Sequence, residues 1–282
     1  ITAFFSDRCR MECHKHDLPC PRQFFEDNRG PGQLFGGADS MTYDEVMDEL
    51  TWKNPRRVRV CELFKVVVVR QVYQRFCPEG LAPEDMRVLD FSAGWGDRMV
   101  AALSLGADYT GVDPSECMAP VYKRIARELG RGATQARVLQ KGFETATEAD
   151  LPSDSFDVVF SSPPFFKLET YEAGNAAQSV RKFGTPEAWA EGFLRPVVQT
   201  SFRCLRRGGY FCVNLEDYTD RSGGRAAAED GLRGGARALR AGGRVRRERG
   251  QHVLGDQVRG RRARGHAGLG PEVDALEGAR VA

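Results

Sequence analysis

The chain of 282 residues lacks the usual signs of a membrane or secreted protein. It has no run of about 18 apolar residues, which a membrane-spanning helix needs, so no membrane partner is expected. No signal-peptide pattern opens it, because charged residues soon follow Phe4 and Phe5. An initiator Met is also missing, and we expect the chain to be a fragment. The net charge of +2 gives no global argument for a polyanionic partner.

The eight cysteines are scattered and do not follow the spacing of a secreted disulfide framework. Most stand singly among apolar residues, where a reduced, buried thiol is the usual state. We therefore expect free thiols and an intracellular protein.

Five possible zinc ligands gather near the N-terminus, namely Cys9, Cys13, His14, His16 and Cys20. Their spacing fits no common zinc finger, and the usual Cys-x2-Cys pair is absent. A Cys/His-rich surface loop is favoured over a zinc site, and no metal is predicted.

Composition divides the chain into three parts. Residues 1–57 are polar and interrupted by Pro and Gly, which predicts an irregular N-terminal segment. Residues 58–220 alternate apolar runs with helix-like stretches. Residues 221–282 are rich in Arg, Gly and Ala and lack Phe, Tyr, Trp and Ile, which leaves too little apolar surface for a packed core. We expect this low-complexity tail to be disordered or, as the favoured reading, the product of a shifted reading frame near Asp220.

The middle part predicts an α/β fold. Apolar runs predict strands at 87–91, 109–113, 137–140, 156–160 and 210–215. Longer stretches with charges at helical intervals predict helices at 62–76, 97–105, 115–129 and 189–205. Near-continuous apolar strands that alternate with helices indicate a parallel sheet covered on both faces. Ligands of such sheets bind beyond the carboxyl ends of the strands, where the motifs below lie.

The first motif, DFSAGWGD at 90–97, joins a strand to a helix. Its glycines let the backbone approach a ligand, and a helix N-terminus follows them. A dinucleotide site would have a third glycine where Met99 stands, which argues against that class. The acid Asp113 ends the next strand and can accept both hydroxyls of a bound ribose. Its alternative role is to cap the following helix.

The second motif, Ser162-Pro163-Pro164-Phe165, follows the most apolar strand. Two prolines are hard to place inside a sheet, but they stiffen a turn. The Ser162 side chain and the Pro163 carbonyl would hold the hydrogens of an aromatic amino group and expose the nitrogen lone pair. Phe165 would stack on the ring, and positioning would lower the barrier to an in-line methyl transfer. The alternative is a Pro-rich turn without chemistry.

Together these motifs resemble the class I, Rossmann-like amino-methyltransferases that use S-adenosylmethionine, a group that includes DNA N6-adenine and N4-cytosine methyltransferases. The runs LDFSAGWGDR and SSPPFF are also similar to a methylase-like group of phages, large viruses and microbial eukaryotes. The resemblance covers about residues 62–217 and implies S-adenosylmethionine as the cofactor. The cofactor-binding residues that it implies are Asp90, Ser92, Ala93, Gly94, Gly96, Asp113, Phe143 and Glu144. The catalytic residues that it implies are Ser162, Pro163, Pro164 and Phe165.

The chain departs from this family at several positions. Ser92 stands where many members have Phe, Trp95 where a small residue is common, and Phe165 in place of Tyr. Only about 70 residues separate the cofactor turn from Ser162, so no target-recognition domain fits between them. The loop at 167–183 follows the catalytic turn and is expected to close over the substrate.

The resemblance implies methyl transfer to an exocyclic amino group of a nucleic-acid base flipped from the stack, with adenine N6 or cytosine N4 of DNA as the first choices. Nucleic acid, DNA before RNA, is the expected partner. Two alternatives stay open. One is methylation of a protein glutamine amide or a small-molecule nitrogen, and the other is an inactive, truncated methylase fold that binds nucleic acid.

Overall fold

The computed structural model describes most of the chain up to Asn214. The described residues are 2–15, 18–37, 40–54, 56–131, 135–164, 166, 169–172, 174–214, 218–219, 225–226, 245–246 and 276–281.

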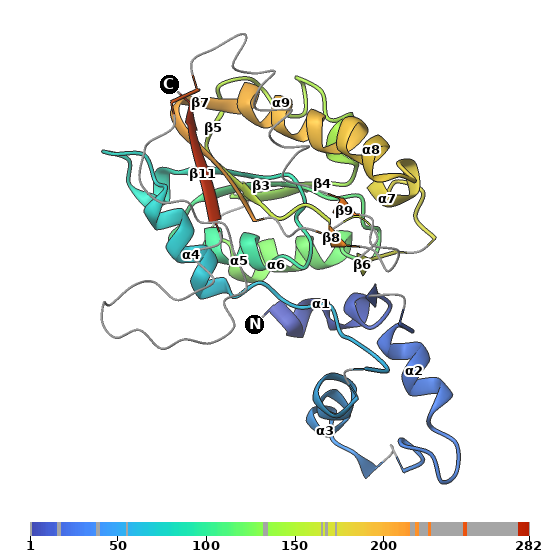
Figure 1. The fold of residues 1–282 in the computed structure, drawn as a ribbon. Coiled ribbons are helices and arrows are strands. Elements are labelled where there is room, and N and C mark those ends of the chain that lie inside the picture. The colour runs from blue at the N-terminus through green and yellow to red at the C-terminus, as the bar shows by residue number, and fades with distance from the viewer. Residues whose placement is uncertain are drawn as a thin grey trace, which may run out of the picture.

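A sheet with the strand order β10-β11-β7-β5-β2-β3-β4 forms the centre of the structure (Figure 1). Its five parallel strands are β2 (Arg87–Asp90), β3 (Asp108–Val112), β4 (Ala136–Leu139), β5 (Phe156–Ser161) and β7 (Leu205–Asn214). The chain runs outward from β2 to β4 and then returns to β5 on the other side of β2. This reversal creates the switch point at which doubly wound sheets bind their ligands.

Helices cover both faces of this sheet (Figure 1). Helices α4 (Val66–Arg75), α5 (Asp97–Leu105) and α6 (Ala119–Leu129) lie on one face, and α7 (Ser179–Lys182), α8 (Pro186–Trp189) and α9 (Arg195–Cys204) lie on the other. Neighbouring strand residues alternate between the two cores, so Val88 packs with α4 and α5 whereas Leu89 packs with α9. The parallel sheet covered by helices on both faces confirms the predicted Rossmann-like fold. The strands could be predicted because burial on both faces makes them nearly continuous apolar runs.

The predicted elements shift at their ends. The helix predicted from residue 62 begins at Val66, because the backbone of Lys65 is extended and the Phe64 N–H donates to Asp97 Oδ2 at 3.1 Å. The helix predicted at 189–205 ends at Cys204, and the strand predicted from 210 begins already at Leu205. A π-helical turn, η5 (Ala190–Leu194), precedes α9, and short 3-10 turns, η3 (Pro83–Asp85) and η4 (Phe143–Thr145), precede β2 and follow β4.

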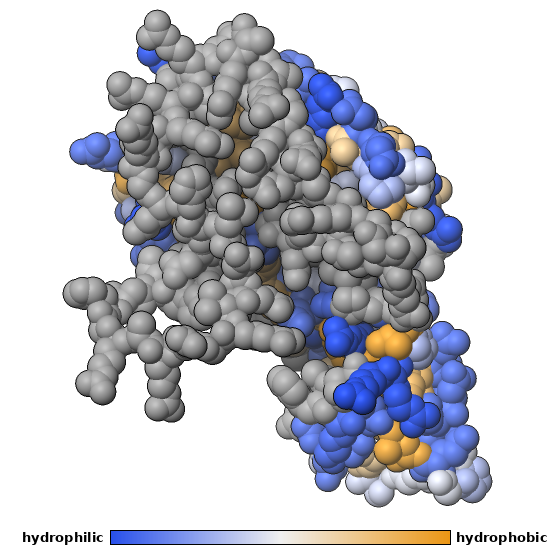
Figure 2. All heavy atoms as spheres, viewed as in Figure 1, coloured by the Kyte–Doolittle hydropathy of each residue, from blue (hydrophilic) through white to orange (hydrophobic). Residues whose placement is uncertain are grey.

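The N-terminal segment, predicted to be irregular, contains short helices and a strand. These are α1 (Thr2–Arg10), β1 (His14–Lys15), α2 (Pro21–Asp27), α3 (Tyr43–Asp48) and the π-helical η2 (Glu49–Lys53). α2, α3 and η2 form a small lobe beside the sheet (Figure 1), with an apolar cluster of Phe24, Phe35, Leu50, Val58 and Val60. α1 packs instead on the sheet domain, because its Cys9 belongs to the core that contains Val88. Most of the lobe's visible surface is hydrophilic, with hydrophobic residues between the polar ones (Figure 2).

The expectation of free thiols is wrong for four cysteines. Cys9 bonds to Cys117 and Cys13 bonds to Cys61, across sequence separations of 108 and 48. Local spacing could not reveal these pairs, because they form only when the N-terminal segment packs on the sheet domain. The bonds also use two ligands of the zinc alternative, while His16 lies outside the described residues. Among described residues, no group of three or more His, Cys, Asp or Glu could hold a metal ion.

The tail predicted at 221–282 lies mostly outside the described residues. Its described pieces are β9 (Arg225–Ala226), which pairs with β8 (Tyr218–Thr219), and two further strands, β10 (Val245–Arg246) and β11 (Leu276–Val281). β11 runs antiparallel to β7 and extends the central sheet. In the part of the chain that the structure describes, no helix has the length and apolar character to cross a membrane.

Candidate active site

A cavity of about 360 Å³ lies at the carboxyl ends of the parallel strands. Each of the five strands contributes a residue that follows or ends it. These residues are Ser92 and Gly94 after β2, Asp113 after β3, Phe143 and Glu144 after β4, Ser162 and Pro164 after β5, and Asn214 at the end of β7. The structure thus brings the predicted cofactor turn and the predicted catalytic turn to one cavity.

The turn after β2 has its shape because of two glycines. Gly94 and Gly96 have φ angles of 55° and 88°, in the left-handed region that disfavours other residues. Gly96 is the N-cap of α5, and Asp97 in the first turn of this helix lines the cavity. The Ala93 N–H donates to the Val112 carbonyl at 3.1 Å and fastens the turn to β3.

The carboxylate of Asp90, at the end of β2, holds this turn through hydrogen bonds. It is fully buried, and its Oδ2 accepts hydrogen bonds from Arg98 Nε at 2.8 Å and the Tyr109 hydroxyl at 2.6 Å. Its Oδ1 accepts from the Ser92 N–H at 3.1 Å, and Arg98 also donates to the Ser92 carbonyl. Among the described lining residues Asp90 is absent, as are Ala93, Gly96 and Pro163. Asp90 therefore positions the turn, and the surfaces of Ser92 and Gly94 are the ones that reach a ligand.

Asp113 faces the same turn from β3. Its Oδ2 accepts from the Gly94 N–H at 2.8 Å, and its Oδ1 accepts from the Ser115 N–H at 2.9 Å. Burial raises the pKa of Asp113 to about 6, against these two hydrogen bonds, which lower it. Above that pH the carboxylate is ionised and keeps lone pairs for further donors. The alternative role, a helix N-cap, is not met, because α6 begins at Ala119 with Met118 as its N-cap and Asp113 accepts instead from the Ser115 N–H in the preceding turn.

Glu144 lies after β4 with one oxygen in use and one without a partner. Its Oε1 accepts from Lys182 Nζ at 2.6 Å. Its Oε2 is buried and has no hydrogen-bond partner among the described residues. A buried acceptor left unpaired costs about 1–3 kcal/mol, so a ligand donor at this position would be favoured. Phe143, packed on Phe91 with ring centroids 5.9 Å apart, supplies the adjoining apolar wall.

The predicted catalytic turn follows β5. Ser162 and Pro164 line the cavity, whereas Pro163 is buried behind it. The Phe166 N–H donates to the Pro164 carbonyl at 2.9 Å, and Phe166 has a φ of 48°, so the chain turns sharply after the two prolines. Phe165 lies outside the described residues, and its stacking role stays a prediction.

The other side of the cavity joins the loop predicted to close over the substrate, at 167–183, to Lys15, a residue that sequence reasoning missed. β1 pairs with β6 (Glu169–Thr170), which brings Lys15 Nζ within 2.8 Å of Glu169 Oε1. The Tyr171 hydroxyl donates to Glu169 Oε2 at 2.5 Å, and the Tyr171 ring meets Trp95 edge-on at 5.5 Å. Burial, followed by the charge of Glu169, raises the pKa of Tyr171. No local pattern in the sequence indicates Lys15, because its pairing with Glu169 forms only in the folded protein.

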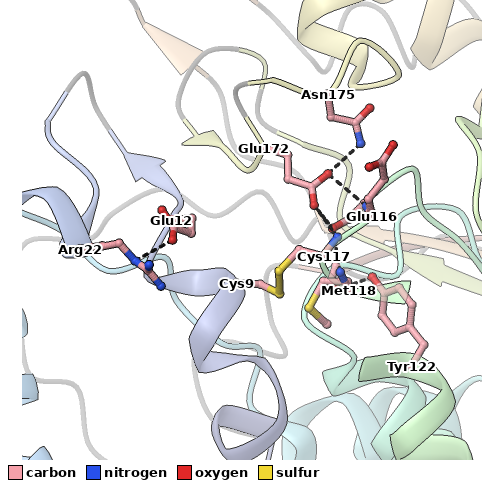
Figure 3. Close-up of a disulfide and its surroundings, with 11 residues drawn as sticks. Cys9, Glu12, Arg22, Glu116, Cys117, Met118, Tyr122, Glu172 and Asn175 are labelled. Carbon is pink, nitrogen blue, oxygen red and sulfur yellow. Dashed lines mark hydrogen bonds and ion pairs between the residues drawn. A yellow bond between two sulfur atoms is a disulfide. The ribbon is translucent and has the colours of Figure 1, made fainter. Parts of the chain in front are cut away.

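The loop after β6 lies over the turn between β3 and α6 (Figure 3). Glu172 accepts hydrogen bonds from the Ser115 hydroxyl at 3.0 Å and from the Cys117 N–H at 2.6 Å. Asn175 donates to the Pro114 carbonyl at 2.9 Å. The segment expected to close over the substrate thus contacts the turn that follows Asp113.

Comparison with known proteins agrees with this architecture. Residues 88–187 match the family model of a methyltransferase domain. The match spans β2 to α8 and supports the predicted methyltransferase class, with S-adenosylmethionine as its cofactor. None of the curated proteins matches the chain.

Three solved structures illustrate the similarity. The YcgJ protein from Bacillus subtilis is 23% identical over 53% of this chain and 50% of its own, with a TM-score of 0.36. A SAM-dependent methyltransferase from Methanosarcina mazei is 17% identical over 54% and 57%, with a TM-score of 0.36. Geranyl diphosphate C-methyltransferase from Streptomyces coelicolor A3(2) is 18% identical over 51% and 42%, with a TM-score of 0.36. The chain spans about half the length of these structures.

Proposed function

We propose that the chain transfers a methyl group from S-adenosylmethionine to an exocyclic amino group of a nucleic-acid base, with adenine N6 or cytosine N4 of DNA as the leading acceptors. The observation that supports this most is that Ser162 and Pro164 line the same cavity as Gly94 and Asp113. A cofactor turn and a Ser-Pro-Pro turn that share one cavity allow donor and acceptor to meet without bulk water between them.

The cofactor half of the cavity fits S-adenosylmethionine. Asp113 would accept hydrogen bonds from the ribose hydroxyls, and the unpaired Oε2 of Glu144 would accept a hydrogen bond from the adenine amino group. The turn around Gly94 and the N-terminus of α5 would hold the amino-acid end. When bound, this cofactor supplies an electrophilic methyl group on a positively charged sulfur.

In the acceptor half of the cavity, Ser162 is the residue that would bind the target amino group. Its hydroxyl would accept a hydrogen bond from the target amino group and turn the nitrogen lone pair toward the cofactor half of the cavity. Pro163 and Pro164 fix the backbone beside it, because each proline ring fixes its own φ angle. The rate advantage would come from orientation rather than from a strong base.

One observation favours a second candidate, methylation of a protein amide or a small-molecule nitrogen. The described lining carries more carboxylates than cations. The carboxylates are Glu62, Asp97, Asp113, Glu144, Glu169 and Glu172, and the cations are Lys15, Lys65 and Arg98. Such a wall suits a neutral or cationic acceptor better than a phosphate. A flipped base meets this condition only if its phosphates stay outside the cavity.

The test is methyl transfer from tritiated S-adenosylmethionine to DNA, RNA, protein and amine acceptors, each offered alone. Label in DNA that depends on Ser162 would support the proposal. Ser162→Ala should lower turnover about 10- to 100-fold, because positioning is lost. Ser104→Ala is the matched control, since Ser104 is exposed on α5 and bonds only to its own helix. Label confined to protein or amines would replace the leading candidate with the second.

A further inference from the structure

Two disulfides join the N-terminal segment to the sheet domain, and they differ in their surroundings. Cys13 and Cys61 are completely buried, and Arg10 donates to the Cys61 carbonyl at 3.0 and 2.8 Å. Cys9 and Cys117, in contrast, both line the cavity. Cys9 is 5% exposed, and Cys117 is only half-buried, so the bond is open to the cavity at Cys117. A small reductant in the cavity can therefore reach the Cys9–Cys117 bond, whereas the Cys13–Cys61 bond is shielded by packing.

The Cys9–Cys117 bond is connected to Asp113, the predicted ribose acceptor, by a short chain of contacts, of which Figure 3 shows the disulfide and Glu172. Cys117 and Ser115 both donate to Glu172 Oε1, at 2.6 and 3.0 Å. The Ser115 N–H also donates to Asp113 Oδ1 at 2.9 Å. The turn at 114–118 is thus held from α1 by the disulfide, from the loop after β6 by Glu172, and from within by Asp113.

We propose that Cys9–Cys117 is a redox-reactive site that couples the thiol–disulfide state of the protein to cofactor binding. The inference rests on the proposed cofactor site at Asp113. With the bond closed, α1 holds the turn at 114–118 and keeps Asp113 in position. With the bond open, α1 stays near through the packing of the Phe5 ring on Arg124, at 5.0 Å, and through the Cys13–Cys61 disulfide that follows it. Reduction thus loosens the turn without releasing the segment.

The reaction is thiol–disulfide exchange with a dithiol. A thiolate of the dithiol attacks one sulfur of the pair, the Cys9–Cys117 bond breaks, and a mixed disulfide forms. The second thiol of the dithiol attacks that mixed disulfide and becomes oxidised with the first. The protein gains two electrons and two protons as two thiols, and a disulfide oxidant reverses the exchange.

The experiment measures S-adenosylmethionine binding to the full chain by calorimetry, before and after dithiothreitol, with alkylation and mass spectrometry to map the thiols. Limited dithiothreitol should expose Cys9 and Cys117 to alkylation before Cys13 and Cys61. The affinity should fall about 10-fold, a usual size for coupling between two sites. The oxidised Cys13→Ala/Cys61→Ala variant should keep this response, which assigns it to the other bond.

Two more variants sharpen the result. Cys9→Ala/Cys117→Ala should bind as weakly as the reduced protein and ignore dithiothreitol. Cys77→Ala is the control for loss of a thiol, because Cys77 is free and lies outside the cavity lining. If the oxidised protein binds the cofactor and reduction changes nothing, the inference is wrong and the proposed function stands. If the oxidised protein binds no cofactor, the proposed function is wrong and the inference falls with it.

Discussion

The sheet domain and the N-terminal segment reach the same cavity by different means. The sheet domain supplies Gly94, Asp113 and Glu144 from the ends of consecutive strands, so the order of the fold alone brings them together. The N-terminal segment supplies Cys9 and Lys15, which arrive through disulfides, an ion pair and the pairing of β1 with β6. The first set depends on local structure, and the second depends on contacts across the sequence.

The two regions therefore differ in how much the folded state depends on them. The strands of the sheet domain are buried on both faces, so their loss would unfold the site. The N-terminal segment has a smaller apolar cluster and is tied to the sheet domain at a few points. The attachment of the N-terminal segment can therefore change while the fold of the sheet domain persists. Four predictions test this contrast between the two regions.

The largest effect is expected from Arg98→Met in the sheet domain. Arg98 and Asp90 form an ion pair with side chains only 7% and 0% exposed. Removing one partner leaves the other charge buried and should cost about 3–5 kcal/mol in the free energy of unfolding. Urea unfolding measures the loss. Arg127→Met is the control, because Arg127 is 74% exposed in its pair with Glu128 and should cost less than about 1 kcal/mol. Equal losses would contradict the supporting role of Asp90.

The next effect compares the two apolar cores. Leu89 and Leu50 are both fully buried, the first in the sheet domain and the second in the N-terminal cluster. Each truncation to Ala should cost about 2–5 kcal/mol. Leu89→Ala should also weaken S-adenosylmethionine binding, whereas Leu50→Ala should change it less than about twofold, since the disulfides keep the segment attached. Calorimetry on both variants measures this, and a large loss of affinity in Leu50→Ala would show that the two regions are one unit.

The same contrast decides what the sequence could predict. The strands, the glycine turn and Asp113 were predictable because each depends on residues close together in the chain and on the end of a strand. The Lys15–Glu169 ion pair and both disulfides could not be predicted, because partners such as Cys9 and Cys117 meet only in the folded protein. Asp90 lies between these cases. Its place before the turn was predicted, but its partner Arg98 shows that it acts through the turn rather than on a ligand.

A smaller effect is expected from pH, through Asp113. Its pKa is raised to about 6 from an ordinary 3.8, mainly by burial. The carboxylate therefore takes up a proton as the pH falls through about 6, and the affinity for S-adenosylmethionine should drop up to about tenfold for each further pH unit. Its contribution to stability has the opposite sign, being present below about pH 3.8 and lost as the pH rises through about 6.

Calorimetry between pH 5 and 8, with urea unfolding at the same points, separates these two signs. Asp113→Asn should bind weakly at every pH and show a flat profile. Asp108→Asn is the control, because Asp108 is exposed at the opposite end of the same strand, and it should keep the wild-type profile. A wild-type affinity that is constant across pH 6 would contradict a role for the ionised Asp113.

The smallest effect tests the contribution of the N-terminal segment to the acceptor side. Lys15 is 12% exposed in its pair with Glu169, whose other carboxylate oxygen accepts a hydrogen bond from Tyr171. Lys15→Met keeps most of the apolar stem but removes the charge, so it should raise the KM for the methyl acceptor a few-fold and leave cofactor affinity within about twofold. Lys53→Met is the control, because Lys53 is exposed and pairs with Glu49 outside the cavity. If Lys15→Met weakened cofactor binding instead, the N-terminal segment would belong to the cofactor half, and the contrast between the two regions would need to be redrawn.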